Sequence, residues 1–155
     1  MSGETDQTLT REGLAELEAF AIEVAREAGA ATLPYFRTRI EVDDKAGDRR
    51  FDPVTAADRE AEAIVRARIA ERHPDHGLLG EERGHEPGAG RLEWVVDPVD
   101  GTRSFICGLL HWGLLLALTE DGRPRLGVVH QPWTDELWVG VAGEATYRRG
   151  TLSEP

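Results

Sequence analysis

The sequence predicts an α+β protein in which two long helices are layered on an antiparallel sheet. Apolar residues recur at helical spacing in two long stretches, 10–34 and 55–74, and the spacing then changes to the shorter period typical of strands. A chain of 155 residues is long enough for one domain with a real core. We expect residues 1–9 to be a disordered tail and residues 10–155 to fold as one unit.

The first helix is predicted to begin after Thr10, which is a suitable N-cap residue. It should end near Pro34 and bury an apolar stripe formed by Leu14, Leu17, Ala21, Val24, Ala25 and Ala28. The segment 38–52 is dense in charge and contains a central glycine, so we expect an exposed loop or hairpin there.

The second helix is predicted to begin at Thr55, with Asp58 three residues later as in a capping box, and to stop at Pro74. Its buried face should consist of Ala57, Ala61, Ile64, Val65 and Ile69.

Strands are expected in the remainder of the chain. A short apolar run at Leu78–Leu79 leads into a turn-rich stretch, 80–90, and residues 94–96 then form a buried strand that runs into Asp97. Further strands fit residues 112–119, 125–130 and 136–141, and the turn at 120–123 closes the first pair as a hairpin.

Composition excludes several classes of protein. The formal net charge of −11 argues against a nucleic-acid partner, which clustered Lys and Arg would have to bind. No run approaches the roughly 20 apolar residues of a membrane span, and the acidic residues 1–7 do not resemble a signal peptide, so we expect no membrane partner and a cytoplasmic location. A homodimer is possible.

Three side chains with reactive or ligating groups are given ordinary structural roles. Cys107 is the only cysteine, so one chain cannot form a disulfide or a cysteine-based zinc site, and a small packed side chain is the expected role. His111 and His130 could be ligands or bases, but surface or core histidines are commoner.

The segment WVVDPVDGT, residues 94–102, carries the strongest chemical signal. A buried strand delivers Asp97 and Asp100, while Pro98 and Gly101 shape a tight turn that can direct the Val99 carbonyl inward. Such oxygen ligands suit magnesium, which keeps positions for substrate phosphate. Asp, Pro and Gly are also the commonest turn formers, so the string alone fits a solvated turn.

Other residues favour the metal site over the solvated turn. Glu81 and Glu82 form a second acidic turn after an apolar run, and Asp58 places a carboxylate at the start of a helix. Thr102 adds a hydroxyl that can orient a water molecule.

Three blocks, 53–58 (PVTAAD), 78–82 (LLGEE) and 94–102, resemble the inositol monophosphatase-like phosphatases in order and spacing. The resemblance extends from about Leu14 to Tyr147. It implies the N-terminal half of the sugar-phosphatase fold, a metal-binding domain whose C-terminal α/β partner domain is absent here. It also implies two or three Mg²⁺ ions, for which Mn²⁺ can substitute.

The resemblance implies roles for individual residues. Glu81, Asp97 and the Val99 carbonyl would hold one Mg²⁺, and Asp97 and Asp100 would share a second. Glu81 and Thr102 would position the attacking water.

Asp58 would accept a hydrogen bond from the Thr102 hydroxyl, although it can equally be a helix-capping acid. The backbone N–H groups of Gly101 and Thr102 would face the substrate phosphate. Arg103 is a candidate substrate contact or a solvated arginine. Lys45 is a further candidate near the metals.

The implied reaction is phosphomonoester hydrolysis, in which metal ions gather the phosphate, activate water and stabilise the leaving alkoxide. Residues 103–113 and 122–132 resemble the bacterial histidinol-phosphate phosphatase branch, which acts in histidine biosynthesis. Histidinol phosphate is therefore the expected substrate, and inositol-1-phosphate is the alternative. A chain that lacks the partner domain would be inactive or weakly active alone, or a non-catalytic remnant that binds metal or dimerises.

Overall fold

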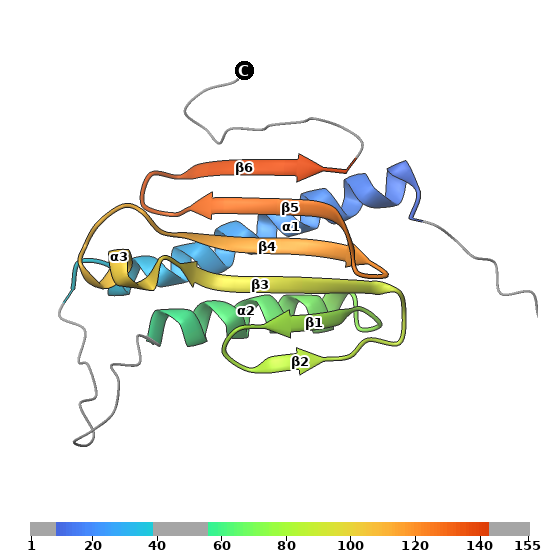
Figure 1. Cartoon of the computed structure of the whole chain (residues 1–155), viewed down its shortest axis with the longest axis horizontal. Helices are drawn as coiled ribbons and strands as arrows, with labels where there is room; N and C mark the ends of the chain where they lie inside the picture. Colours follow the sequence, from blue (N-terminus) through green and yellow to red (C-terminus); the bar gives the residue numbers. More distant parts are fainter. Residues whose placement is uncertain (1–8, 39–55, 143–155) are drawn as a thin grey trace, which may run out of the picture.

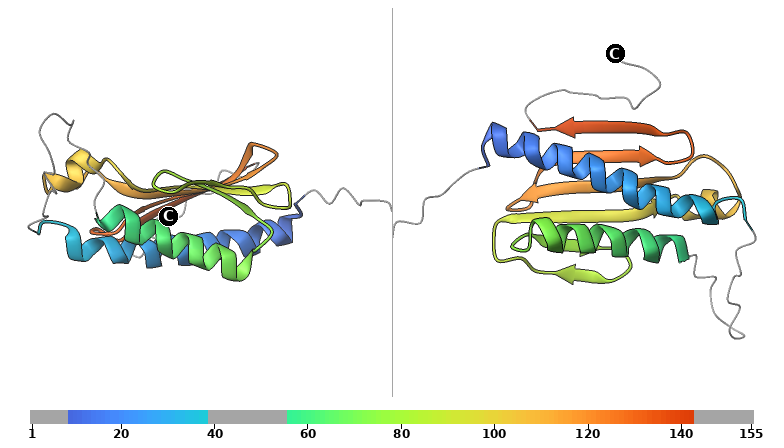
Figure 2. Two further views of the ribbon diagram at one scale, coloured as in Figure 1. Left: turned by 90° about the horizontal axis from the view of Figure 1, so that it is seen from below. Right: turned by 180° about the vertical axis from the view of Figure 1, so that it is seen from behind.

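The computed structural model describes residues 9–38 and 56–142, where two long helices cover one face of a six-stranded sheet (Figures 1 and 2). Residues 39–55 lie outside these ranges. They include most of the loop expected at 38–52, Lys45, and the predicted start of the second helix at Thr55. No helix in the described part is long and apolar enough to cross a membrane.

Both predicted helices form. Helix α1 spans Arg11–Thr32, and the Oγ1 atom of its N-cap, Thr10, accepts a hydrogen bond from the Gly13 N–H at 3.1 Å. A short 3₁₀ helix, η1 (Leu33–Tyr35), follows. Helix α2 spans Ala56–Arg72 and ends before Pro74. Every residue of the predicted apolar stripe of α1 is buried, so this prediction is confirmed.

The sheet has the strand order β2-β1-β3-β4-β5-β6. The strands are β1 (Gly77–Gly80), β2 (Gly84–Glu86), β3 (Leu92–Asp100), β4 (Gly113–Glu120), β5 (Arg123–Gln131) and β6 (Glu136–Val141). Strands β3 to β6 form the predicted antiparallel meander. The β4–β5 hairpin turns at Asp121 and Gly122, both with positive φ, as the turn chemistry indicated.

The expectation of an antiparallel sheet is wrong for one pair of strands, because β1 runs parallel to β3. The stretch 80–90, expected to be rich in turns, also contains β2, which pairs antiparallel with β1 at the sheet edge. The α+β class is confirmed, and the sheet is mixed. The parallel pairing brings the carboxyl ends of β1 and β3 to the same end of the sheet. The strand patterns in the sequence did not predict this pairing.

Two apolar clusters hold the layers together. The larger lies between the helices and the sheet, with Trp94, Leu114 and Leu118 fully buried in it. The smaller joins η1, the start of α2, the end of β3 and the short helix α3 (Thr102–Ile106), and consists of Phe36, Ala57, Val99, Phe105 and Trp112. Helix α3 was not predicted. Cys107, which follows it, is exposed, so the expected packed side chain is wrong.

Candidate functional site

The parallel pairing of β1 with β3 places two of the predicted site residues next to each other. Gly80 pairs with Val96 in the register, so Glu81 and Asp97 are the next residues along two adjacent strands. Figure 1 shows β1 and β3 pointing toward the end of the molecule where α2 begins and α3 lies. The candidate site is therefore built at one end of the sheet.

An irregularity in β3 brings Asp100 toward Asp97. Residues three apart on a regular strand project from opposite faces. Here Asp97 pairs with Leu115 and Asp100 with Gly113, so β3 contains one residue more than β4 between the two pairs. Pro98, which has no N–H to donate, lies within this bulge. The bulge gives the physical reason why a D-P-x-D string can direct both carboxylates to one place.

Gly101 lets the chain leave β3 and enter α3 at once. Its φ is +86°, and an added Cβ atom would lie 2.5 Å from the His111 carbonyl oxygen. A side chain there is opposed by both the backbone conformation and the neighbouring chain. The predicted tight path at Gly101 is confirmed.

The charge environment of Asp97 shows which acids gather at this end. Burial raises the pKa of the half-buried Asp97 carboxyl to about 7, with contributions from the charge and hydrogen bond of Glu81 and from the charges of Asp100 and Asp58. The side chain of Asp58 is only 4% exposed, in the first turn of α2. Burial also raises the pKa of Glu82, and Asp58 adds to that shift. Carboxylates from three elements thus repel one another around Asp97.

Thr102 lies next to these acids with its hydroxyl directed at the main chain. Its Oγ1 donates to the Val99 carbonyl oxygen at 3.0 Å. A hydroxyl has one proton, so Thr102 does not also donate to Asp58 in this arrangement. Asp58 makes another interaction, and the Asp58–Thr102 hydrogen bond stays a prediction.

The oxygens at this end fit Mg²⁺ in donor type, although they are not assembled into a complete ligand set. One carboxylate oxygen of Asp97, Oδ1, is buried without a hydrogen-bond partner. A cation would satisfy that atom and reduce the repulsion that raises the Asp97 pKa. Within residues 9–38 and 56–142, however, no three His, Cys, Asp or Glu side chains are grouped closely enough to hold an ion. Glu81, Asp58 and Asp100 each interact with Asp97 without together enclosing a site.

Sequence reasoning missed two buried charges behind the site, Glu62 and Arg66 of α2. A signal was present, because Asp58, Glu62 and Arg66 are spaced four apart and adjoin the buried line of Ala57, Ala61 and Val65. Charged residues that repeat with the same spacing as the apolar stripe of a helix, and lie next to it, are placed at the border between that helix and the sheet.

The remaining candidates occupy ordinary environments. His130 is buried, with Nδ1 3.1 Å from the Ala25 carbonyl oxygen and Nε2 3.5 Å from Asp135, as expected for a core histidine. His111 is exposed, and Arg103 is an exposed residue of α3.

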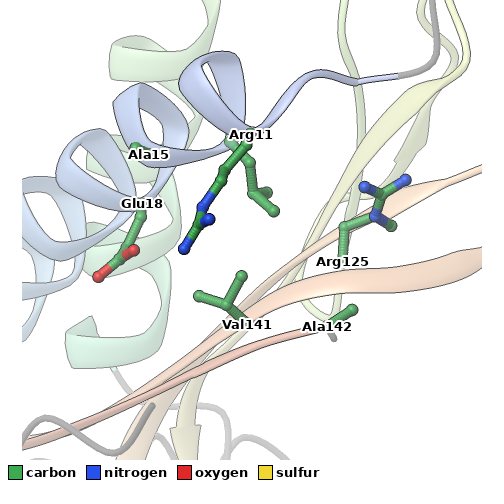
Figure 3. A pocket seen from close by; sticks show the side chains of 7 residues that line it. Arg11, Ala15, Glu18, Arg125, Val141 and Ala142 are labelled. Carbon is green, nitrogen blue, oxygen red and sulfur yellow. The ribbon is translucent and has the colours of Figure 1, made fainter. Parts of the chain in front are cut away.

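A pocket of about 350 Å³ lies away from the carboxylates, between the start of α1 and the edge of the sheet at β5 and β6 (Figure 3). It is lined by Arg11, Leu14, Ala15, Glu18, Arg125, Val141 and Ala142. Both the first and last described residues, 9 and 142, are near this end, so we assign it no function.

Comparison with known proteins gives one consistent family. The family model described as "Inositol monophosphatase family" matches residues 13–154. A histidinol-phosphatase of Chlorobaculum parvum is 41% identical over 132 residues, which are 84% of this chain and 50% of that protein. The bifunctional phosphatase IMPL2, chloroplastic, of Arabidopsis thaliana is 36% identical over 153 residues, 97% of this chain and 43% of that protein.

The fold agrees with a solved relative. An inositol monophosphatase from Zymomonas mobilis superposes with a TM-score of 0.74 at 39% identity, over 94% of this chain and 56% of that one. The chain thus spans about half the length of the relatives that it matches.

Proposed function

Since this chain belongs to the inositol monophosphatase family, we propose that it forms the metal-binding part of a Mg²⁺-dependent phosphatase for small phosphate monoesters. The observation that carries the proposal is Asp97, which combines an unpartnered buried oxygen with three neighbouring carboxylates that raise its pKa. Such a cluster is unfavourable for the fold by itself, and a divalent cation would offset its repulsion.

The proposed ligands are Glu81, Asp97, the Val99 carbonyl and Asp100. Bound Mg²⁺ would supply Lewis acidity to the phosphate and lower the pKa of a water molecule. Glu81, exposed at the end of β1, and the Thr102 hydroxyl would orient that water. Mn²⁺ is expected to substitute, because it also accepts carboxylate and carbonyl oxygens.

Residues around Thr102 would bind the phosphate and orient the water. Gly101 and Thr102 would present their backbone N–H groups to the phosphate, and Arg103 would contact the substrate from α3. Asp58 would accept a hydrogen bond from the Thr102 hydroxyl when that hydroxyl turns away from the Val99 carbonyl. This exchange is open to Thr102, since its hydroxyl can rotate.

Histidinol phosphate is the proposed substrate, supported by the 41% identity to a histidinol-phosphatase. Inositol-1-phosphate is the second candidate, supported by the 39% identity to an inositol monophosphatase of similar fold. We further propose that full activity needs a second α/β domain that completes the substrate cleft. Positioning and electrostatic stabilisation of the phosphate both depend on such an opposing wall.

The metal site is tested by isothermal titration of Mg²⁺ or Mn²⁺ into the chain and three variants. Asp97→Asn should lose all detectable binding, whereas Asp100→Asn should chiefly weaken one ion. Asp121→Asn is the control, because Asp121 lies in the exposed β4–β5 turn. Equal binding by the Asp97→Asn and Asp121→Asn variants would refute the assignment.

The substrate is tested by phosphate release from histidinol phosphate, inositol-1-phosphate and adenosine 3',5'-bisphosphate at saturating Mg²⁺. We would assay this chain beside a chimera extended with the second half of the Chlorobaculum parvum relative. The chimera should prefer histidinol phosphate, and the chain alone should turn over far below about 1 per second, the lower end of the range usual for enzymes. Faster turnover by the chain alone would contradict the need for a second domain.

A further inference from the structure

A buried ion pair on α2 lies directly behind the turn that carries Glu81. The Glu62 side chain is fully buried and that of Arg66 is 8% exposed. The two are one helical turn apart, with Arg66 Nε donating to Glu62 Oε1 at 2.8 Å. Buried ion pairs are weak contributors to stability, because desolvation offsets their attraction. Stability alone therefore gives a poor account of this pair.

The contacts of the pair converge on the residues that follow Glu81. The Glu62 carboxylate accepts hydrogen bonds from the backbone N–H groups of Glu82, at 2.7 Å, and Arg83, at 3.1 Å. Arg66 donates to the Gly84 carbonyl oxygen at 2.7 Å. The same side chain lies 2.9 Å from a carboxylate oxygen of Glu86 in β2. Two side chains of α2 thus hold the whole β1–β2 turn.

The residue before Glu81 is held just as closely. A Cβ atom added to Gly80 would lie 2.4 Å from Glu62 Oε1 and 2.7 Å from Arg66 Nη2. The end of β1 therefore rests directly on the ion pair, and a Cβ atom at position 80 would displace these two side-chain ends. The main chain is fixed on both sides of Glu81, while the Glu81 side chain stays exposed toward Asp97.

The pair also suits the charge of its surroundings. Arg66 offsets much of the charge of Glu62, so the Glu62 carboxylate supplies two strong acceptors to the turn while paired with a cation. Hydrogen bonds to an ionised acceptor are roughly twice as strong as neutral ones. A neutral apolar pair would lose these acceptors and leave the Glu82 and Arg83 N–H groups unsatisfied.

We infer that Glu62 and Arg66 are positioning residues that fix the β1–β2 turn so that Glu81 can bind a divalent cation together with Asp97. The inference rests on the proposed metal site and adds two residues of α2 that hold the turn carrying one of its ligands. Neither side chain is among the proposed ligands of the ion. Residues that orient metal ligands in this way typically change affinity about 10–100-fold when they are replaced.

The test is isothermal titration of Mn²⁺ into the chain and its Glu62→Gln variant. We expect binding at least about tenfold weaker, because glutamine cannot accept both N–H bonds and pair with Arg66. Glu120→Gln is the matched control. Glu120 is also a buried glutamate paired with an arginine, Arg125, but it lies opposite the start of β3, at the other end of the sheet. The affinity of the Glu120→Gln variant for Mn²⁺ should stay within about twofold of the unsubstituted chain. That change is small beside the roughly 10–100-fold loss expected when a residue that orients a ligand is replaced.

A double-variant cycle separates positioning from general destabilisation. If Glu62 acts through Glu81, adding Glu62→Gln to Glu81→Gln should change Mn²⁺ affinity by less than about twofold. Thermal unfolding in EDTA, run on every variant, shows that the titrated protein is folded. Should Glu62→Gln be too unstable to titrate, Arg66→Lys replaces it, since lysine keeps the charge but loses the fork that joins Glu62 to Gly84. That variant should also bind Mn²⁺ more weakly.

The outcomes distinguish this inference from the proposed function. If Asp97→Asn abolishes Mn²⁺ binding while Glu62→Gln, or Arg66→Lys in its place, binds like the unsubstituted chain, the inference is wrong and the metal site stands. The inference is equally wrong if Glu62→Gln weakens binding as much without Glu81 as with it. If Asp97→Asn leaves binding unchanged, the metal site and the inference fail together.

Discussion

Asp97 and Gly101 show how the site constrains single residues. The Asp97 carboxylate is half-buried and lies near Glu81, Asp100 and Asp58, so burial first and their charges second disfavour its ionised form. Gly101 adopts a conformation that other residues rarely reach. Repulsion between carboxylates is typical of functional sites, where a ligand is the compensating factor.

Gly101→Ala is expected to destabilise the chain by about 3 kcal/mol, the sum of left-handed backbone strain and a clash with the His111 carbonyl. Gly122→Ala is the matched control. Gly122 also has a positive φ, +73°, but an added Cβ atom would meet nothing within 4 Å. It should cost only about 1 kcal/mol. Urea denaturation measures both, and equal losses would show that the contact with His111 is unimportant.

At the scale of elements, the junction of α2 with β1 and β3 depends on neutral imidazoles. The rings of His73 and His76 are stacked with centroids 4.7 Å apart, and the Trp94 indole N–H donates to His76 Nδ1 at 3.1 Å. An imidazolium has no lone pair to accept that bond. Burial lowers the pKa of both His73 and His76. Arg72 lowers that of His73 further, while His73 lowers and Asp75 raises that of His76.

These lowered pKa values predict a loss of stability in acid. The unfolded chain takes up protons near pH 6.5 while the folded chain does not, so the contribution is complete above pH 6.5 and is lost as pH falls through the lowered values. His76→Gln keeps an acceptor for the Trp94 indole but does not titrate. Its unfolding free energy should therefore fall less steeply below pH 6.5 than that of the unsubstituted chain.

Urea denaturation from pH 7.5 to about 5 measures the two slopes, over the interval where histidine titrates. The unsubstituted chain must be compared with His76→Gln because Asp97 has the opposite effect on the pH dependence of stability. Its raised pKa, about 7, means that the folded chain binds a proton first, so this contribution increases as pH falls. Parallel curves for the two proteins would contradict the role given to His76.

At the scale of the whole molecule, the net charge of −11 and the carboxylates at one end of the sheet predict two separable effects of salt. Any salt screens the general repulsion between like charges. A divalent cation that binds the folded site adds mass-action stabilisation, about 2.7 kcal/mol at a hundred times its dissociation constant.

Thermal unfolding in MgCl₂ and in NaCl at equal ionic strength distinguishes these effects. The melting temperature should rise in both salts and several degrees further in MgCl₂. In Asp97→Asn the additional rise should disappear, while the rise in NaCl remains. An equal additional rise in that variant would place the bound cation elsewhere on the molecule.

The sequence by itself determined the local elements and the chemistry of the site. Thr10 and the stripe from Leu14 to Ala28 specified α1, because capping and helical period are properties of neighbouring residues. The hairpin at Asp121 and Gly122 followed from turn preferences for the same reason. The D-P-x-D-G string specified the type of ligand that this end of the sheet offers.

Only the tertiary structure decided where those residues meet. An alternating or apolar pattern does not encode which strand pairs with which, so the parallel pairing of β1 and β3 was not predicted. That Glu81 and Asp97 lie together was expected only from the resemblance to a known family. The spacing of Glu62 and Arg66 beside the apolar stripe was visible in the sequence, but the contacts that bury them were not. Helical spacing places a charge at the border of an apolar face, but the strand turn packed against that border decides whether the charge is exposed to water or holds a backbone in place.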